Sequence, residues 1–168
     1  PSPTHFDLIH ALADAGKPIF CEKPIDMSSY RVRQCIAKIA AAGIPFMTAF
    51  NQRFDPHFAT LQKRLAAGEI GELESVSIIS RDPLPPPRDY LKGSGGIFRD
   101  MMIHDFDMAN FLMGGAPVTV SAVGSSIVDP AIGAAGDVDT AVVTLHFADG
   151  RLAVIKNSRR AVYGYDQR

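Results

Sequence analysis

Apolar and polar positions follow two different periods in the first third of the chain. Apolar residues recur at helical spacing over residues 5–15 and again over residues 28–42, and a glycine follows each segment. A short apolar run of strand length comes next in each case, at residues 17–21 and 45–50. Short buried strands that alternate with helices are typical of a parallel sheet with crossover helices, so this region is predicted to be a βαβ unit of the α/β class.

The pattern changes after residue 54, where we predict a domain boundary. Residues 56–67 have helical periodicity, and residues 72–80 alternate between small polar and apolar side chains as a strand does. Four prolines lie between residues 82 and 96. Because proline has no backbone N–H, this stretch is predicted to be a loop without regular pairing. A helix is predicted to follow over residues 98–113.

Three strand patterns then follow, over residues 118–128, 139–147 and 151–158, with a tight turn predicted at Ala148-Asp149-Gly150. We expect these strands to pair antiparallel into an open sheet with helices on one face, which makes the second part of the chain an α+β domain. The sheet is expected to hold more apolar surface than one helix can cover and to contact another subunit. The residues expected to supply that surface are Ile127, Val143, Leu145, Leu152, Val154 and Ile155.

Composition and charge narrow the classes of function. With 17 basic and 18 acidic residues, the chain has no electrostatic footprint for nucleic acid and no polybasic membrane patch. Its expected partners are a small molecule and further copies of itself. Cys21 and Cys35 lack disulfide or metal-ligand spacing, which favours a reducing cytoplasm. The chain has no initiating Met and no signal peptide, and we expect both of its ends to be cuts within a longer chain.

Charged residues stand where two of the predicted strands end. Glu22 and Lys23 follow the first strand pattern, and Asn51 and Arg53 follow the second. In open parallel sheets, ligands bind outside the carboxyl ends of the strands, so these side chains are expected to line a cofactor or substrate site. The alternative interpretation of Glu22 and Lys23 is a solvated pair of loop charges.

A second group of polar residues lies within the helix predicted over residues 98–113. Asp100 and His104 are four residues apart, so on one helix the carboxylate would share a face with the imidazole and could orient it. One alternative is a core histidine next to an aspartate that caps the helix. A zinc site is another, less favoured because no second His or Cys lies nearby at ligand spacing. Upstream, residues 93–96 lack the Lys-Ser or Lys-Thr of a phosphate-binding loop, and we interpret them as a glycine hinge.

Four short motifs occur in a fixed order along the chain. They are Pro3-Thr4-His5, Glu22-Lys23-Pro24, Asn51-Gln52-Arg53-Phe54, and the pair Gly95-Gly96-Ile97-Phe98-Arg99-Asp100 and His104-Asp105-Phe106-Asp107. Together they resemble the glucose-fructose oxidoreductase, inositol dehydrogenase and rhizopine catabolism (Gfo/Idh/MocA) family over nearly the whole chain. The resemblance is closest to the inositol dehydrogenases, through residues 99–108 and 163–168.

The resemblance implies two domains with an active site between them. Residues 1–54 would be the C-terminal part of a dinucleotide-binding Rossmann domain, and residues 55–168 part of a substrate-binding and oligomerisation domain. The catalytic residues implied are Lys23, Asp100 and His104. The cofactor-binding residues implied are Thr4, His5, Glu22, Lys23, Pro24, Asn51 and Arg53. The substrate-binding residues implied are Lys23, Arg53, Asp100, His104 and Tyr163, with no metal.

The implied reaction is the oxidation of a secondary alcohol of a cyclic polyol, myo-inositol to scyllo-inosose, with NAD as the hydride acceptor. The sequence contains no GxGxxG motif, so the choice between NAD and NADP depends on the resemblance alone, and this stretch by itself is expected to be inactive. Two alternatives stay open: a dehydrogenase of another sugar or sugar acid, and a non-catalytic oligomerisation module. The set of Lys23, Asp100 and His104 favours the enzyme. The expected oligomer is a dimer or tetramer formed through the open sheet.

Overall fold

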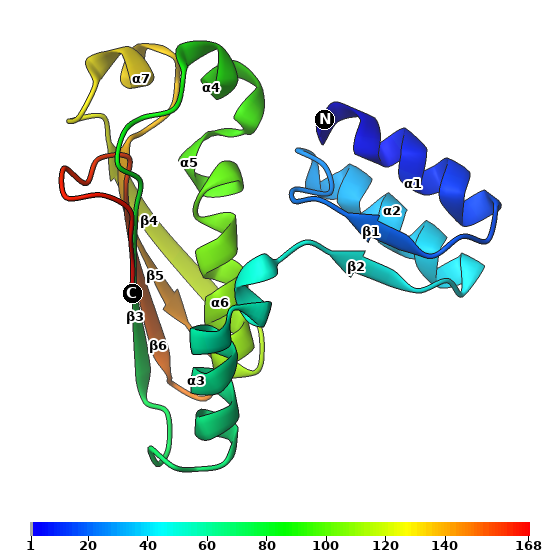
Figure 1. The fold of residues 1–168 in the computed structure, drawn as a ribbon, viewed down its shortest axis with the longest axis horizontal. Helices are drawn as coiled ribbons and strands as arrows, with labels where there is room; N and C mark the ends of the chain where they lie inside the picture. The colour runs from blue at the N-terminus through cyan, green and yellow to red at the C-terminus, as the bar shows by residue number, and fades with distance from the viewer. Residues whose placement is uncertain (1) are drawn as a thin grey trace. The chain divides into compact units, whose positions relative to one another are not determined.

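The computed structural model describes residues 2–168, with the side chains of Arg88 and Lys92 left aside. The chain forms two compact units, one ending at Asn51 and the other spanning Gln52–Arg168 (Figure 1). Each unit has an apolar core of its own. Among the described residues, no helix combines the length and the apolar character that crossing a membrane requires.

The first unit is a βαβ arrangement that begins with an additional helix. Its elements are η1 (Ser2–Thr4), α1 (His5–Asp14), β1 (Ile19–Cys21), α2 (Ser29–Ala42) and β2 (Phe46–Thr48). Strands β1 and β2 pair in parallel, with Ile19 opposite Phe46, which confirms the predicted α/β pattern. Helix α2 begins where Ser28 Oγ accepts the N–H of Arg31, and it ends at Gly43 in the left-handed conformation.

The second unit is a five-stranded mixed sheet with helices on one face. Its elements are η2 (Asn51–Phe54), α3 (Pro56–Ala66), β3 (Ser75–Arg81), α4 (Arg88–Ser94), α5 (Gly96–Asp100), α6 (Ile103–Met113), β4 (Thr119–Ser125), α7 (Pro130–Ala134), β5 (Thr140–His146), β6 (Leu152–Ser158) and β7 (Asp166–Gln167). The strand order is β4-β5-β6-β3-β7. The predicted antiparallel pairing of β4, β5 and β6 is confirmed, whereas β3 pairs with β6 in parallel. Helices α3, α5 and α6 lie along the same side of the sheet in Figure 1.

The core of the second unit lies between this sheet and α5 and α6. The two-residue period of β5 turns every second side chain inward, and Val143 and Leu145 are therefore buried together with Ile155 of β6. The prediction that these three residues form an exposed face is wrong, because they point toward the helices. Of the six residues expected to supply that face, Ile127 and Leu152 are exposed and Val154 is partly buried.

The predicted single helix over residues 98–113 is two helices. Helix α5 ends at Asp100 and α6 begins at Ile103, with a turn at Met101 and Met102 between them. The N–H of His104 donates to the carbonyl of Met101 at 3.3 Å, whereas a continuous helix would use the carbonyl of Asp100. Met102 is fully buried in the core, and the break in the helix accompanies this placement. Asp100 and His104 are therefore not one turn apart on a single helix, and that prediction is wrong.

The predicted loop over residues 82–96 contains a short helix. Helix α4 starts directly after Pro87, the last of the four prolines, so none of them interrupts its hydrogen bonds. Gly95 and Gly96 follow with φ of 84° and 75°, conformations that side chains other than glycine rarely adopt. The predicted hinge is thus a tight connection from α4 to α5.

Candidate functional site

The loop after β1 carries three of the predicted site residues. Glu22 is exposed, Lys23 is partly buried and Pro24 is buried. The N–H of Lys23 donates to Oε2 of Glu22 at 3.3 Å, and the peptide bond between Lys23 and Pro24 is cis. The loop therefore presents one acidic and one basic side chain at the carboxyl end of a strand, as predicted from the sequence.

The first unit brings other predicted residues to this loop. Nδ1 of His5, the first residue of α1, lies 3.0 Å from the carbonyl oxygen of Pro24. Thr4 precedes it and is exposed. Asn51 follows β2 on the same sheet edge as Glu22, because β1 and β2 are parallel and Ala49 N–H extends their pairing to the carbonyl of Cys21. These residues thus form one polar rim within the first unit.

In the second unit, Asp100 contacts Tyr90 and Arg159. Its Oδ1 accepts a hydrogen bond from the hydroxyl of Tyr90 at 2.8 Å, and its Oδ2 lies 3.9 Å from Nη2 of Arg159. Arg159 follows β6 and is only 1% exposed, and the same Nη2 lies 3.6 Å from Oδ2 of Asp137. A buried guanidinium requires nearby negative charge, and the two partly buried aspartates supply it, so the three side chains form one charged cluster.

Tyr90 serves as a donor to this cluster. Burial and the hydrogen bond to the carboxylate of Asp100 together raise the pKa of Tyr90 to about 12. The hydroxyl therefore keeps its proton at neutral pH and can donate a hydrogen bond to Asp100.

His104 lies in the first turn of α6 and is partly buried. Asp107, three residues further along the same helix, accepts hydrogen bonds from Nε and Nη2 of Arg53 at 2.7 and 2.6 Å. The bond to Asp107 raises the pKa of Arg53, whose guanidinium also stacks over the ring of Phe111 at 4.9 Å. Because residues three apart are neighbours on a helix, this ion pair lies beside His104.

Tyr163 lies near the end of the sheet where the parallel strands β3 and β6 finish. Its hydroxyl donates to Oδ2 of Asp166 at 2.7 Å and accepts from Nη1 of Arg81 at 3.2 Å. Arg81 ends β3 opposite Ser158, the last residue of the parallel strand β6, and Arg159 follows directly. Tyr163 and the cluster around Asp100 are therefore both at the end of the sheet where β3 and β6 finish.

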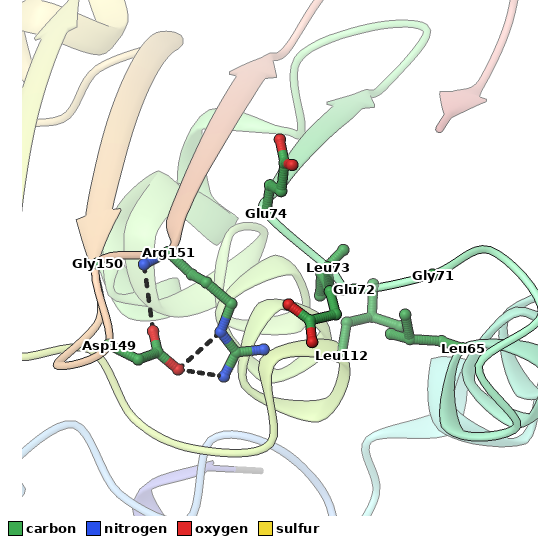
Figure 2. Close-up of a pocket in the computed structure, with 9 residues that line it drawn as sticks. All are labelled: Leu65, Gly71, Glu72, Leu73, Glu74, Leu112, Asp149, Gly150 and Arg151. Atoms are coloured by element: carbon green, nitrogen blue, oxygen red, sulfur yellow. Dashed lines mark hydrogen bonds and ion pairs between the residues drawn. The ribbon is translucent and has the colours of Figure 1, made fainter.

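A hollow of about 700 Å³ lies at the other end of the same sheet (Figure 2). It is lined by Leu65, Gly71, Glu72, Leu73, Glu74, Leu112, Asp149, Gly150 and Arg151. Arg151 precedes β6 and Arg159 follows it, so at about 3.3 Å per residue roughly 26 Å of strand separates this hollow from the Asp100 cluster. None of the predicted site residues lines it.

Sequence reasoning missed Tyr90, Asp137 and Arg159. Arg159 could have been found, because it is a charged residue directly after a predicted strand, the same feature that identified Lys23 as a candidate. Tyr90 and Asp137 have no local pattern that marks them. Among the described residues, no group of three His, Cys, Asp or Glu side chains is arranged to hold a metal ion. Lys23 belongs to the first unit and Asp100 and His104 to the second, so their convergence stays a prediction.

Comparison with known proteins gives consistent matches. The model of the GFO/IDH/MocA C-terminal domain matches residues 58–168. The chain is 56% identical over 168 residues to the inositol 2-dehydrogenase of Rhizobium meliloti (strain 1021), covering 100% of this chain and 51% of that protein. The chain thus spans about half the length of such relatives.

Solved structures match the fold in the same way. A crystal structure of a myo-inositol dehydrogenase from Corynebacterium glutamicum ATCC 13032 has a TM-score of 0.94 and 49% identity, over 99% of this chain and 50% of that one. A scyllo-inositol dehydrogenase from Lactobacillus casei, solved with bound NAD(H) and scyllo-inositol, has a TM-score of 0.90 and 29% identity, over 99% of this chain and 51% of that one.

Proposed function

Because the chain belongs to the GFO/IDH/MocA family, we propose that it forms part of an NAD-dependent oxidoreductase acting on a cyclic polyol. The proposed reaction oxidises a secondary alcohol of myo-inositol to the ketone scyllo-inosose. The observation that carries this proposal is the set of polar groups around Asp100 and Tyr163 at the end of the sheet where β3 and β6 finish. Carboxylates, guanidinium groups and phenols of this kind suit a ligand that is rich in hydroxyl groups.

The chemistry of the proposed reaction assigns a role to each catalytic residue. Imidazole groups take up protons near neutral pH, so His104 is the general base that removes the proton of the substrate hydroxyl. The ammonium group of Lys23 stabilises the negative charge that develops on the same oxygen. The carboxylate of Asp100 accepts hydrogen bonds from the substrate hydroxyls. As the proton leaves the oxygen, hydride leaves the carbon, and the C–O bond becomes a carbonyl.

NAD supplies the hydride acceptor when it is bound. The polar rim of the first unit, Glu22, Lys23 and Asn51, fits the nicotinamide end of such a cofactor, because it lies at the carboxyl edge of a parallel strand pair. Thr4, His5 and Pro24 complete this rim. Arg53, which belongs to the second unit, is the further cofactor-binding residue of the proposal. The preference for NAD over NADP is part of the proposal. So is a cytoplasmic location, which the free thiols of the buried Cys21 and Cys35 suit.

The proposal is tested on the complete enzyme with a panel of polyols, sugars and sugar acids, each with NAD and with NADP. We expect NADH formation to be fastest with myo-inositol. Lys23→Met should strongly lower turnover, whereas Lys17→Met, the same change at an exposed lysine of the first unit, should leave turnover near the wild-type value. Faster oxidation of a sugar acid would favour the alternative dehydrogenase, and a wild-type enzyme that oxidises none of these substrates would refute the proposal.

A further inference from the structure

We infer that the buried guanidinium of Arg159 and the partly buried carboxylate of Asp137 position the carboxylate of Asp100 for the reaction. The inference rests on the proposed dehydrogenase function, which makes Asp100 a catalytic residue. Neither Arg159 nor Asp137 belongs to the predicted catalytic or ligand-binding sets, and both act through Asp100. They are therefore positioning residues.

The guanidinium of Arg159 provides the charge that organises this region. Its Nη2 lies 3.9 Å from Oδ2 of Asp100 and 3.6 Å from Oδ2 of Asp137, and the side chain is 1% exposed. These separations are longer than hydrogen bonds, so the attraction is between charges in buried surroundings where water screens little. Without Arg159, the two carboxylates would repel each other, and each would lose the attraction of this buried positive charge.

Asp137 holds the beginning of the helix that carries Asp100. Its Oδ1 accepts the N–H of the buried Ile97 at 3.0 Å, and a Cβ at Gly96 would lie 2.5 Å from the same oxygen. Glycine at position 96 thus permits the close approach of Asp137 to α5. Because α5 spans only Gly96–Asp100, Asp137 restrains its first residues while Arg159 restrains its last residue.

The two carboxylate oxygens of Asp100 have different partners. Oδ1 accepts the hydroxyl hydrogen of Tyr90 and Oδ2 faces Arg159, so the plane of the carboxylate is set from both sides. Reaction geometry depends on such restraint, because a displacement of about 1 Å can lower a rate about a hundredfold. Arg159 and Asp137 therefore determine how Asp100 meets the substrate.

The test uses four variants of the complete enzyme. Arg159→Met removes the charge at similar volume, and Arg159→Lys keeps it. The double variant Arg159→Met with Asp137→Asn also removes the carboxylate that loses its partner, while the asparagine oxygen can still accept the N–H of Ile97. Arg151→Met is the matched control, because Arg151 precedes the same strand, bonds to the carbonyl of Met113 and lies far from Asp100.

Two readouts separate positioning from a merely structural role. We expect Arg159→Met to lower kcat about 10- to 100-fold with NAD affinity within about twofold of wild type, and Arg159→Lys to recover part of the loss. The double variant should regain thermal stability without regaining turnover. Backbone hydrogen exchange over residues 96–102 should accelerate at least about tenfold in Arg159→Met and stay at the wild-type rate in Arg151→Met.

The exchange readout does not depend on activity. A wild-type enzyme that oxidises no polyol would refute the proposed function, while the exchange rates would still decide whether Arg159 restrains α5. Arg159→Met with wild-type kcat and wild-type exchange over residues 96–102 would overturn the inference, even if its melting temperature falls. If Arg159→Met does not fold, kcat and hydrogen exchange over residues 96–102 are measured on Arg159→Lys and on Asp137→Asn. Wild-type kcat together with wild-type exchange in these two variants would overturn the inference.

Discussion

Asp105 is a fully buried carboxyl group directly after His104. Its Oδ2 accepts a hydrogen bond from Nδ2 of Asn157 on β6 at 2.7 Å. Burial raises the pKa of Asp105, the hydrogen bonds from Asn157 and Ser80 lower it, and the charge of Asp82 raises it. The resulting pKa is about 6. The ionised form of this group is therefore less stable in the fold than in the unfolded chain.

This difference gives a prediction for the pH dependence of stability. An unfolded aspartate has a pKa of about 3.9, so the contribution of Asp105 is fully present below about pH 4 and is lost as pH rises through about 6, by up to about 3 kcal/mol. Asp105→Asn does not titrate. The free energy of unfolding of Asp105→Asn minus that of the wild type, measured in urea from pH 4 to 8, should therefore increase up to about pH 6 and then level off. A difference that stays constant with pH would contradict the prediction.

His104 can be tested separately from cofactor binding. In the complete enzyme, His104→Ala should lower turnover about a hundredfold to ten-thousandfold, because a general base acts on the proton in the transition state. NAD affinity, titrated by fluorescence, should change little. His57→Ala replaces an exposed histidine of α3 and should leave both quantities near wild type. Near-normal turnover in a folded His104→Ala enzyme would remove His104 from the mechanism.

At the scale of single elements, the connection from α4 to α5 depends on glycine. Gly96 has φ of 75°, and an added Cβ would lie 2.5 Å from Oδ1 of Asp137, so Gly96→Ala should destabilise the protein by at least about 1–3 kcal/mol. Gly93 lies within α4 and has open space around its Cα, so Gly93→Ala should raise stability by up to about 1 kcal/mol. Thermal unfolding of both variants measures the contrast. If the two substitutions changed the free energy of unfolding equally, the close approach of Asp137 to Gly96 would not contribute to stability.

The elements also differ in how well their sequence patterns predicted them. Strands β5 and β6 follow an apolar period of two, and their positions and pairing were predicted correctly because one face is buried. The break between α5 and α6 was not predicted. The apolar residues on both sides of it, including Met102, fit one continuous helix equally well, and only the burial of Met102 against the sheet distinguishes the two.

At the scale of the whole molecule, exposed apolar residues on the side of the sheet away from the helices indicate that the protein forms an oligomer. On that face Val123 is 74% exposed, Leu152 49% and Val142 41%. Since exposed apolar surface of this kind marks interaction sites, we predict a homodimer or tetramer formed through it. Sedimentation of the complete enzyme should show the oligomer, and Val123→Asp should shift it toward smaller species.

A charge placed elsewhere controls for general effects on solubility. Ile70 is 58% exposed in the loop after α3, away from the strands, so Ile70→Asp should leave the oligomer unchanged. A strict monomer at high concentration of the wild-type enzyme would refute assembly through this face. Equal dissociation by both substitutions would mean that the effect is not specific to the sheet.

The sequence by itself determined the secondary structure periods, the family and the candidate residues Lys23, Asp100 and His104. These depend on local features, namely apolar spacing, strand-end positions and short motifs. A short run of consecutive residues is enough to specify such features. Only the tertiary structure decided that Asp100 is held by Tyr90 and Arg159, that Asp137 reaches the start of α5, and that Arg53 pairs with Asp107. These partners are 10 to 59 positions apart in the sequence. Their contacts arise from sheet pairing and from the burial of charge, which no local pattern specifies.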